Sequence, residues 1–255
     1  MKIENQTAVV SGGASGLGEA TVRLFVENKA KVLIIDQDAA RGEQLQQELG
    51  DQVLFVQTDV RDENQVQEAV RKAYETFGAI HINVNCAGIA LAKKVLSKNG
   101  VHPLEDFRKS IDINLVGTFN VLKVCSDYMS KNEPNAEGER GVIINTASVA
   151  AYEGQIGQAA YAASKGGIVS MILPLAREFA SLGIRVMGIA PGLFYTPLFK
   201  GLPPEAVESL EKQVPFPSRL GKPEEYAHLV KHILYNVMLN GDVIRLDGAI
   251  RMAAR

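Results

Sequence analysis

Short apolar runs alternate along the whole chain with longer stretches in which apolar and polar residues follow a helical repeat. An apolar run of roughly four to eight residues, bounded by turn-forming residues, is typical of a strand buried on both faces. We therefore predict about seven strands, at residues 7–10, 31–36, 52–57, 80–84, 141–145, 184–189 and 243–246.

The stretches between these runs predict helices at residues 19–28, 40–49, 62–77, 104–129, 158–181 and 223–236. Strands that alternate with helices indicate an α/β fold, with a parallel sheet covered on both faces. The chain contains no internal repeat and no linker-like tract. Residues 1–255 are therefore expected to form a single Rossmann-like, doubly wound domain.

Some segments depart from this pattern. Residues 95–104 and 132–140 are polar and predict irregular surface loops. Residues 193–220 are rich in proline, and a connection of that length is typical of a functional lid. Pro174 falls inside the predicted helix at 158–181, where it should kink the helix or leave a carbonyl without a partner.

Composition and charge narrow the functional classes. The formal net charge is −2, with 27 basic and 29 acidic residues, which argues against a nucleic-acid or membrane-surface binder. The two cysteines, Cys86 and Cys125, make no disulfide framework and are expected to be buried apolar filler. No apolar run approaches the ~18 residues of a membrane span, and the N-terminus lacks the apolar region of a signal peptide. We expect a soluble protein without a metal site, cytoplasmic, with the mitochondrial matrix as the alternative.

Glycines gather at the first strand-to-helix junction, at Gly12, Gly13, Gly16 and Gly18. Glycines placed there let backbone amides approach a pyrophosphate at the helix N-terminus. On spacing alone, an ordinary tight turn explains them equally well.

Asp36 ends the second predicted strand, eighteen residues beyond Gly18, where a dinucleotide fold places the acid that binds the adenosine ribose. Its carboxylate would repel the 2′-phosphate of NADP, and neither Ser15 nor Gln37 supplies a cation, so we predict NAD. The alternative role for Asp36 is a helix cap. Asp59 is predicted to accept from the adenine amino group, or to cap the next helix.

The chemistry is expected in the stretch from Ser148 to Lys165. Tyr161 and Lys165 are four residues apart and share one face of a helix. A nearby cation favours a phenolate and lowers the pKa of a tyrosine, which can then exchange a proton with an alcohol or ketone. Ser148 would hold the reacting oxygen. In the simpler alternative interpretation, the tyrosine and the lysine are two exposed helix residues with no shared role. Asn114 either bonds a backbone carbonyl or holds a relay water.

These motifs together resemble the short-chain dehydrogenase/reductase family over the whole chain. Ser11-Gly12-x-x-x-Gly16-x-Gly18 resembles its T-G-x-x-x-G-x-G motif, and Asn85-Cys86-Ala87-Gly88 resembles its N-N-A-G motif, with Cys86 replacing an asparagine. Asn114, Ser148, Tyr161 and Lys165 match its catalytic tetrad in order and spacing. The resemblance implies NAD contacts at Gly12, Ser15, Gly16, Leu17, Gly18, Asp36, Asp59, Val60, Cys86, Ala87, Gly88, Tyr161, Lys165, Pro191, Phe194 and Thr196.

Within the family, the chain resembles the members that oxidise short and branched 3-hydroxyacyl-CoA thioesters in fatty acid metabolism. This implies a homotetramer built through the long helices and the C-terminal strand. Lys93, Lys94 and Lys98 would meet CoA phosphates or remain solvated, and Gln155, Gln158, Leu193 and Leu202 are candidates for the acyl pocket. Another secondary alcohol, such as a hydroxysteroid, is the alternative substrate, and a non-catalytic RNA or protein scaffold is the less favoured alternative role.

Overall fold

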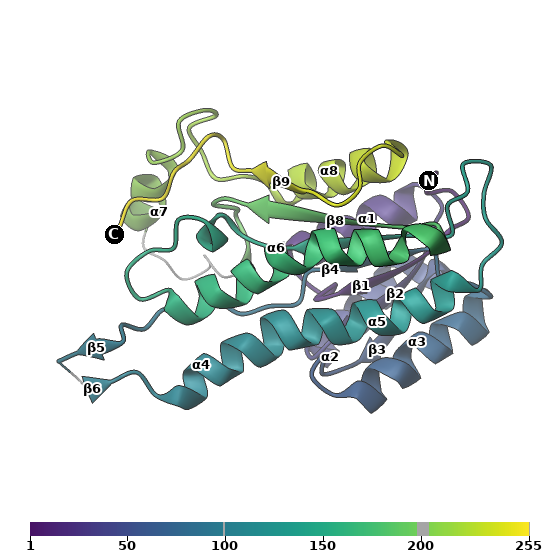
Figure 1. Cartoon of the computed structure of the whole chain (residues 1–255), viewed down its shortest axis with the longest axis horizontal. Helices are drawn as coiled ribbons and strands as arrows, with labels where there is room; N and C mark the ends of the chain where they lie inside the picture. The colour runs from purple at the N-terminus through teal and green to yellow at the C-terminus, as the bar shows by residue number, and fades with distance from the viewer. Residues whose placement is uncertain (99, 198–203, 255) are drawn as a thin grey trace.

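The structure, a computed structural model, describes residues 1–98, 100–197 and 204–254. Seven parallel strands form one sheet in the order β3-β2-β1-β4-β7-β8-β9 (Figure 1). The strands are β1 (Thr7–Ser11), β2 (Lys31–Asp36), β3 (Val53–Gln57), β4 (Ile82–Asn85), β7 (Gly141–Thr146), β8 (Ile184–Pro191) and β9 (Val243–Leu246). The seven predicted strands and the doubly wound α/β fold are thus confirmed.

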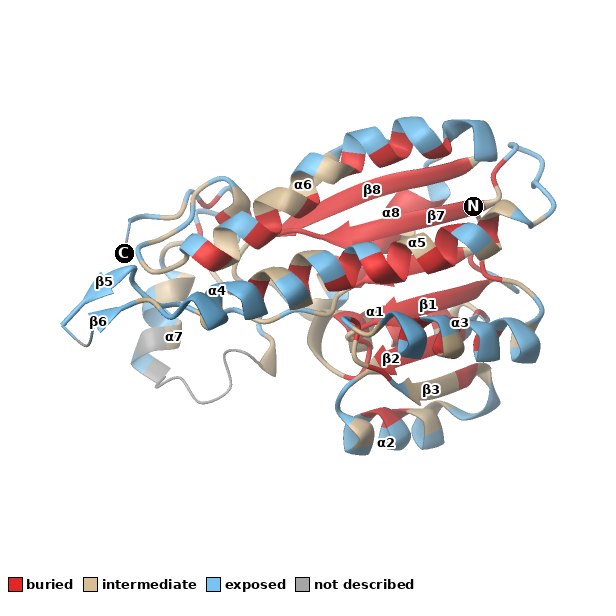
Figure 2. Cartoon of the chain, turned by 60° about the horizontal axis from the view of Figure 1, so that its bottom comes forward, coloured by how far each residue is buried: buried red, intermediate tan, exposed pale blue. Residues whose placement is uncertain are grey.

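Helices cover both faces of this sheet. They are α1 (Gly16–Glu27), α2 (Ala39–Leu49), α3 (Glu63–Phe77), α4 (Leu104–Ile111), α5 (Gly117–Ser130), α6 (Ala159–Phe179), α7 (Pro204–Glu211) and α8 (Pro223–Tyr235). Neighbouring residues of a strand enter opposite cores: Val10 packs with α1 and α8, whereas Val9 packs with α3, α5 and α6. Because most strands are buried on both faces, they appear as continuous apolar runs in the sequence (Figure 2).

The order of the strands reverses at β1. The chain adds β2 and β3 on one side of β1 and then places β4 on the other side. In open parallel sheets, a crevice for ligands forms outside the carboxyl ends of the strands at such a reversal. The glycine-rich turn after β1 and the segment after β4 therefore meet at this crevice.

Two segments differ from the sequence prediction. Residues 95–104 are not wholly irregular, because β5 (Leu96–Ser97) and β6 (Gly100–Val101) pair as a small antiparallel hairpin with exposed side chains. The helices predicted at 104–129 are α4 and α5, but the π-helical turn that joins them at Asp112–Val116 was not predicted. The extra residue in such a turn changes the direction in which nearby side chains point, and π-turns often occur at functional sites.

Helix α6 runs through Pro174, which lies on its exposed side, and continues to Phe179. Contrary to our expectation, one segment, Ala159–Leu182, is long and apolar enough to cross a membrane by length and composition. This segment consists of α6 and the short turn that follows it. It packs against β8, and helices in the core of a protein meet the same two criteria.

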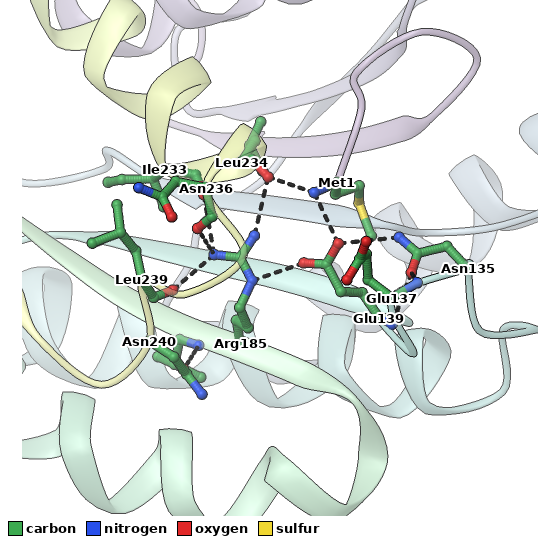
Figure 3. A network of polar contacts seen from close by, with 11 residues as sticks. Met1, Asn135, Glu137, Glu139, Arg185, Ile233, Leu234, Asn236, Leu239 and Asn240 are labelled. Carbon is green, nitrogen blue, oxygen red and sulfur yellow. Dashed lines mark hydrogen bonds and ion pairs between the residues drawn. The ribbon is translucent and has the colours of Figure 1, made fainter.

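A buried ionic network lies at the amino ends of β7 and β8 (Figure 3). Arg185 Nε donates to Glu139 Oε1 at 2.7 Å, and the other carboxylate oxygen pairs with the ammonium of Met1 at 2.8 Å. The two terminal nitrogens of the Arg185 guanidinium donate to backbone carbonyls at the end of α8 and just after it, at Ile233, Leu234, Asn236 and Leu239. Burial opposes ionisation of Glu139, but hydrogen bonds with the ammonium, Asn135 and Arg185 hold its pKa below the usual value.

Candidate active site

A cleft of about 440 Å³ opens at the carboxyl edge of the sheet, beside the reversal in strand order. Its volume is within the range of small-molecule binding pockets. Most residues predicted from the sequence line it: Gly12, Ser15, Gly16, Leu17, Gly18, Asp36, Val60, Cys86, Ala87, Gly88, Ser148, Tyr161, Lys165, Pro191, Phe194 and Thr196. The structure therefore brings together side chains from both halves of the sheet.

The turn after β1 requires glycine for reasons of space. Gly12 has φ +65°, and a Cβ there would lie 2.6 Å from the backbone nitrogen of Ala87. A Cβ at Gly18 would lie 2.1 Å from the carbonyl oxygen of Gly12. Ser15 is the N-cap of α1 but makes no capping bond with its side chain, so the first amides of the helix remain available to an anion. This turn fits a pyrophosphate group.

Asp36 is held at the end of β2 by two backbone amides. Its Oδ2 accepts from Ala14 N at 3.1 Å, and its Oδ1 accepts from Asp38 N at 3.1 Å. Each oxygen keeps a lone pair for a ribose hydroxyl. Among the described residues that line the cleft, Lys165 is the only one with a cationic side chain, so no cation beside Asp36 would balance an added phosphate.

Lys165 is buried between α6 and the end of β7. Its ammonium donates to the carbonyl oxygen of Thr146 at 2.7 Å and lies 5.9 Å from the centre of the Tyr161 ring. Burial lowers the pKa of Lys165 to about 8. The ammonium has two further donors, which can reach a ligand in the cleft.

Tyr161 and Ser148 face each other in the cleft. Burial raises the pKa of Tyr161, and a hydrogen bond with Ser148 lowers it by less. We expected Lys165 to lower the pKa of Tyr161. This expectation is wrong for this geometry, because the burial of the phenolate has the larger effect. Ser148 Oγ accepts from Ala150 N at 3.1 Å, which leaves its hydroxyl proton to bind either Tyr161 or an oxygen atom of a ligand.

Asn114 lies in the π-helical turn and is fully buried. Its side chain exchanges two hydrogen bonds with the backbone of Ile89, at 2.8 and 2.9 Å, and donates a third to Ser164 Oγ at 3.0 Å. A Cβ on Gly88 would lie 3.1 Å from Asn114 Oδ1 and 3.6 Å from Lys165 Nζ. Asn114 therefore holds the segment after β4 close to Lys165, and a relay water at Asn114 stays a prediction.

Comparison with known proteins identifies the family, because residues 6–206 match the short chain dehydrogenase family. The chain belongs to the short-chain dehydrogenases. It is 55% identical over 252 residues to the human 3-hydroxyacyl-CoA dehydrogenase type-2, covering 98% of this chain and 97% of the human protein.

Two solved structures of short-chain dehydrogenases are similar along nearly the whole chain. The 3-hydroxyacyl-CoA dehydrogenase type-2 from Mycobacterium avium superposes with a TM-score of 0.95 at 41% identity, covering 98% of both chains. The 3-ketoacyl-(acyl-carrier-protein) reductase from Brucella melitensis, complexed with NADH, gives a TM-score of 0.86 at 30% identity, covering 98% of this chain and 100% of that protein.

Other predicted residues of this short-chain dehydrogenase lie outside the cleft lining. Asp59 is bound by the Arg61 guanidinium, with its Oδ2 2.6 Å from Arg61 Nη2, although its neighbour Val60 does line the cleft. Gln155 and Gln158 bond each other before α6, and Gln155 also donates to the carbonyl oxygen of Ala253. These contacts explain both glutamines without a substrate.

The structure does not gather in one place the residues that were predicted to bind an acyl-CoA. Lys93 pairs with Asp106 at 2.9 Å, whereas Lys94 and Lys98 are exposed. Leu193 lines a separate pocket of about 100 Å³, together with Phe194. Leu202 lies outside the described residues, as does the part of the predicted lid at 198–203.

Several residues of the site were missed from the sequence. The cleft is also lined by Ile35, Gln37, Thr58, Ile89, Ala90, Ile113, Thr146, Ala147, Gly192 and Pro197. Most of them adjoin a predicted site residue at the end of a strand, so extending each motif by one residue would have found them. Thr146 and Ser164, which bind Lys165 and Asn114, carry no motif signal.

Proposed function

We propose that this short-chain dehydrogenase interconverts a 3-hydroxyacyl-CoA and a 3-oxoacyl-CoA with NAD as the hydride carrier. The observation that carries the proposal is the 55% identity to the human 3-hydroxyacyl-CoA dehydrogenase type-2 across nearly both full lengths. A cleft that combines Ser148, Tyr161 and Lys165 with a phosphate-binding turn supports it independently. The Brucella melitensis relative complexed with NADH supports a nicotinamide cofactor.

The residues of the chain divide the chemistry as follows. Ser148 donates its hydroxyl proton to the oxygen atom of the substrate and fixes the carbon that reacts. Tyr161 takes the proton of the substrate hydroxyl during oxidation and returns it during reduction. The Lys165 ammonium, 5.9 Å from the centre of the Tyr161 ring, would partly offset the burial penalty on negative charge that develops on Tyr161, and would bind the ribose beside it. The nicotinamide, when bound, accepts or supplies the hydride.

A spectrophotometric assay at 340 nm tests the proposal. NADH and NADPH are compared with acetoacetyl-CoA as the oxidised substrate, beside a panel of secondary alcohols that includes a hydroxysteroid. We expect the fastest turnover with acetoacetyl-CoA and NADH. If acetoacetyl-CoA were no better a substrate than a steroid ketone or a simple sugar, the acyl-CoA assignment would be rejected.

Cofactor choice gives a separate prediction at Asp36. Asp36→Asn removes the charge that would repel a 2′-phosphate, and should shift the ratio of kcat/KM for NADH over NADPH by roughly 10–100-fold toward NADPH. Asp38→Asn is the matched control, because Asp38 is an exposed N-cap of α2 and asparagine caps equally well. The control should keep the preference of the parent enzyme. An unchanged ratio in Asp36→Asn would remove Asp36 from the ribose site.

We also propose that the enzyme is a homotetramer. Exposed apolar side chains follow one another along α4, the π-turn and α5, at Leu104, Phe107, Val116 and Phe119. A second copy of the chain would remove this apolar surface from water. Light scattering coupled to size-exclusion chromatography measures the mass, and a monomer at micromolar concentration would contradict the proposal.

A further inference from the structure

Three side chains form a closed ring of hydrogen bonds at the wall of the cleft, and two of them, Cys86 and Thr146, line the cleft. The hydroxyls of Tyr226 and Thr146 are 2.7 Å apart, and Cys86 Sγ lies 3.6 Å from each of them. If Tyr226 donates to Thr146, then Thr146 donates to Cys86, and Cys86 donates to Tyr226. Each group then donates once and accepts once, so every proton in the ring is used.

The phenol of Tyr226 reaches this ring from the opposite side of the sheet to Lys165. Tyr226 is fully buried in the first turn of α8 and belongs to the core formed with α1. Val142 and Ile144 share the side of β7 on which Thr146 lies, and both belong to that same core. Lys165 instead approaches the end of β7 from α6, on the other face.

Thr146 is therefore held on both faces of the sheet. Its side chain is bound by Tyr226, and its carbonyl oxygen accepts the Lys165 ammonium at 2.7 Å. Ala147, which follows, donates from its backbone nitrogen to Ile189 at 2.7 Å, and Ser148 comes next. The position of one peptide group thus affects two residues of the catalytic site.

We infer that Tyr226 is a positioning residue for Lys165. Its hydroxyl fixes the end of β7, and the Thr146 carbonyl fixed in this way holds the Lys165 ammonium beside Tyr161. This assignment rests on the proposed function for its kinetic consequences, but not for its effect on Lys165 itself. Burial raises the pKa of Tyr226, so the phenol stays protonated and keeps its donor over the working range of pH.

A packing role alone would not require the phenolic oxygen. A buried tyrosine fills space equally well as phenylalanine, except for the volume of one oxygen atom. The hydroxyl, in contrast, cannot be lost without leaving Thr146 and Cys86 short of a partner in a buried site. Tyr226→Phe therefore separates positioning from packing.

The test uses the full-length, ligand-free protein with ¹³C-labelled lysine side chains. The Lys165 resonance is assigned by its loss in Lys165→Met and followed by NMR against pH. In the parent protein we expect its midpoint at about 8. In Tyr226→Phe the ammonium is less well held, so the midpoint should move to lower pH by roughly 0.5–1, and kcat on acetoacetyl-CoA should fall by roughly 3–10-fold. KM should change less than kcat.

Matched variants make each outcome decisive. Tyr235→Phe carries the same change at an exposed position of the same helix and should titrate as the parent does. Thr146→Ser keeps the hydroxyl and should keep the Lys165 midpoint of the parent, whereas Thr146→Val should lower this midpoint as Tyr226→Phe does. This pair decides the question if Tyr226→Phe does not fold. A Lys165 midpoint unchanged in Tyr226→Phe or Thr146→Val would overturn the inference, even if the melting temperature fell.

The two proposals fail in different ways. A parent protein that leaves acetoacetyl-CoA unreduced would reject the proposed substrate, while the Lys165 titration would still decide the role of Tyr226. If the parent protein reduced acetoacetyl-CoA but the Lys165 midpoint were unchanged in Tyr226→Phe, only the inference about Tyr226 would be rejected.

Discussion

Tyr161→Phe is expected to reduce kcat on acetoacetyl-CoA by a factor of about 10²–10⁴, while NADH still binds. The change removes the single oxygen that exchanges a proton with the substrate and leaves the ring in place above Lys165. Ser148 cannot replace it, because a serine hydroxyl is a far weaker acid than a phenol. Stopped-flow or steady-state absorbance at 340 nm gives kcat, and quenching of NADH fluorescence gives the affinity.

A control for this variant is available on α5. Tyr128→Phe makes the same change in a tyrosine that packs against Tyr74, with 5.0 Å between the ring centres, outside the cleft lining. Its kcat should match that of the parent. Activity within a factor of about three of the parent in Tyr161→Phe would reject the proton-transfer role, since general acid–base catalysis contributes far more than that.

Arg185→Met should produce the largest loss of stability. The substitution keeps much of the side-chain volume but leaves the Glu139 carboxylate with one cation fewer, and several carbonyls at the end of α8 without a donor. Removing one partner of a buried ion pair costs about 3–5 kcal/mol, which corresponds to a fall in melting temperature of roughly 6–20 °C. Differential scanning calorimetry measures the change.

Two comparisons show whether the loss of buried ion pairing causes the fall in melting temperature. Arg71→Met removes an arginine that pairs with Glu68 and Glu75 on the exposed side of α3, and should leave the melting temperature nearly unchanged. Adding Glu139→Gln to Arg185→Met also takes the anionic partner from the buried Met1 ammonium, so the double variant should melt at a lower temperature than Arg185→Met. A melting temperature equal to that of the parent in Arg185→Met would show that the network contributes nothing.

The strands were predictable because the physical cause is local. A strand buried on both faces must be apolar at successive positions, as in Val32, Leu33 and Ile34, and such a run is visible without any tertiary information. The hairpin of β5 and β6 was missed for the opposite reason. Its strands have two residues each and their side chains are exposed, so no burial pattern marks them.

The candidate site divides in the same way. Gly12, Asp36, Tyr161 and Lys165 were predictable, because each is tied to a residue type that the chemistry or the turn requires at a fixed spacing. The partnership of Thr146 with Tyr226 was not, because it joins residues 80 positions apart and depends on how α8 packs. The raised pKa of Tyr161 also required the structure, since burial cannot be read from a four-residue spacing.

The Arg185 network and the catalytic cleft lie at opposite ends of the same strands. The ions surround the amino ends of β7 and β8, whereas Ser148 and the cleft follow the carboxyl ends. Heat tolerance and substrate choice can therefore evolve as nearly separate traits in this enzyme. Directed evolution toward a new alcohol would select substitutions at the carboxyl edge of the sheet. Selection for growth at higher temperature would select them at the amino edge.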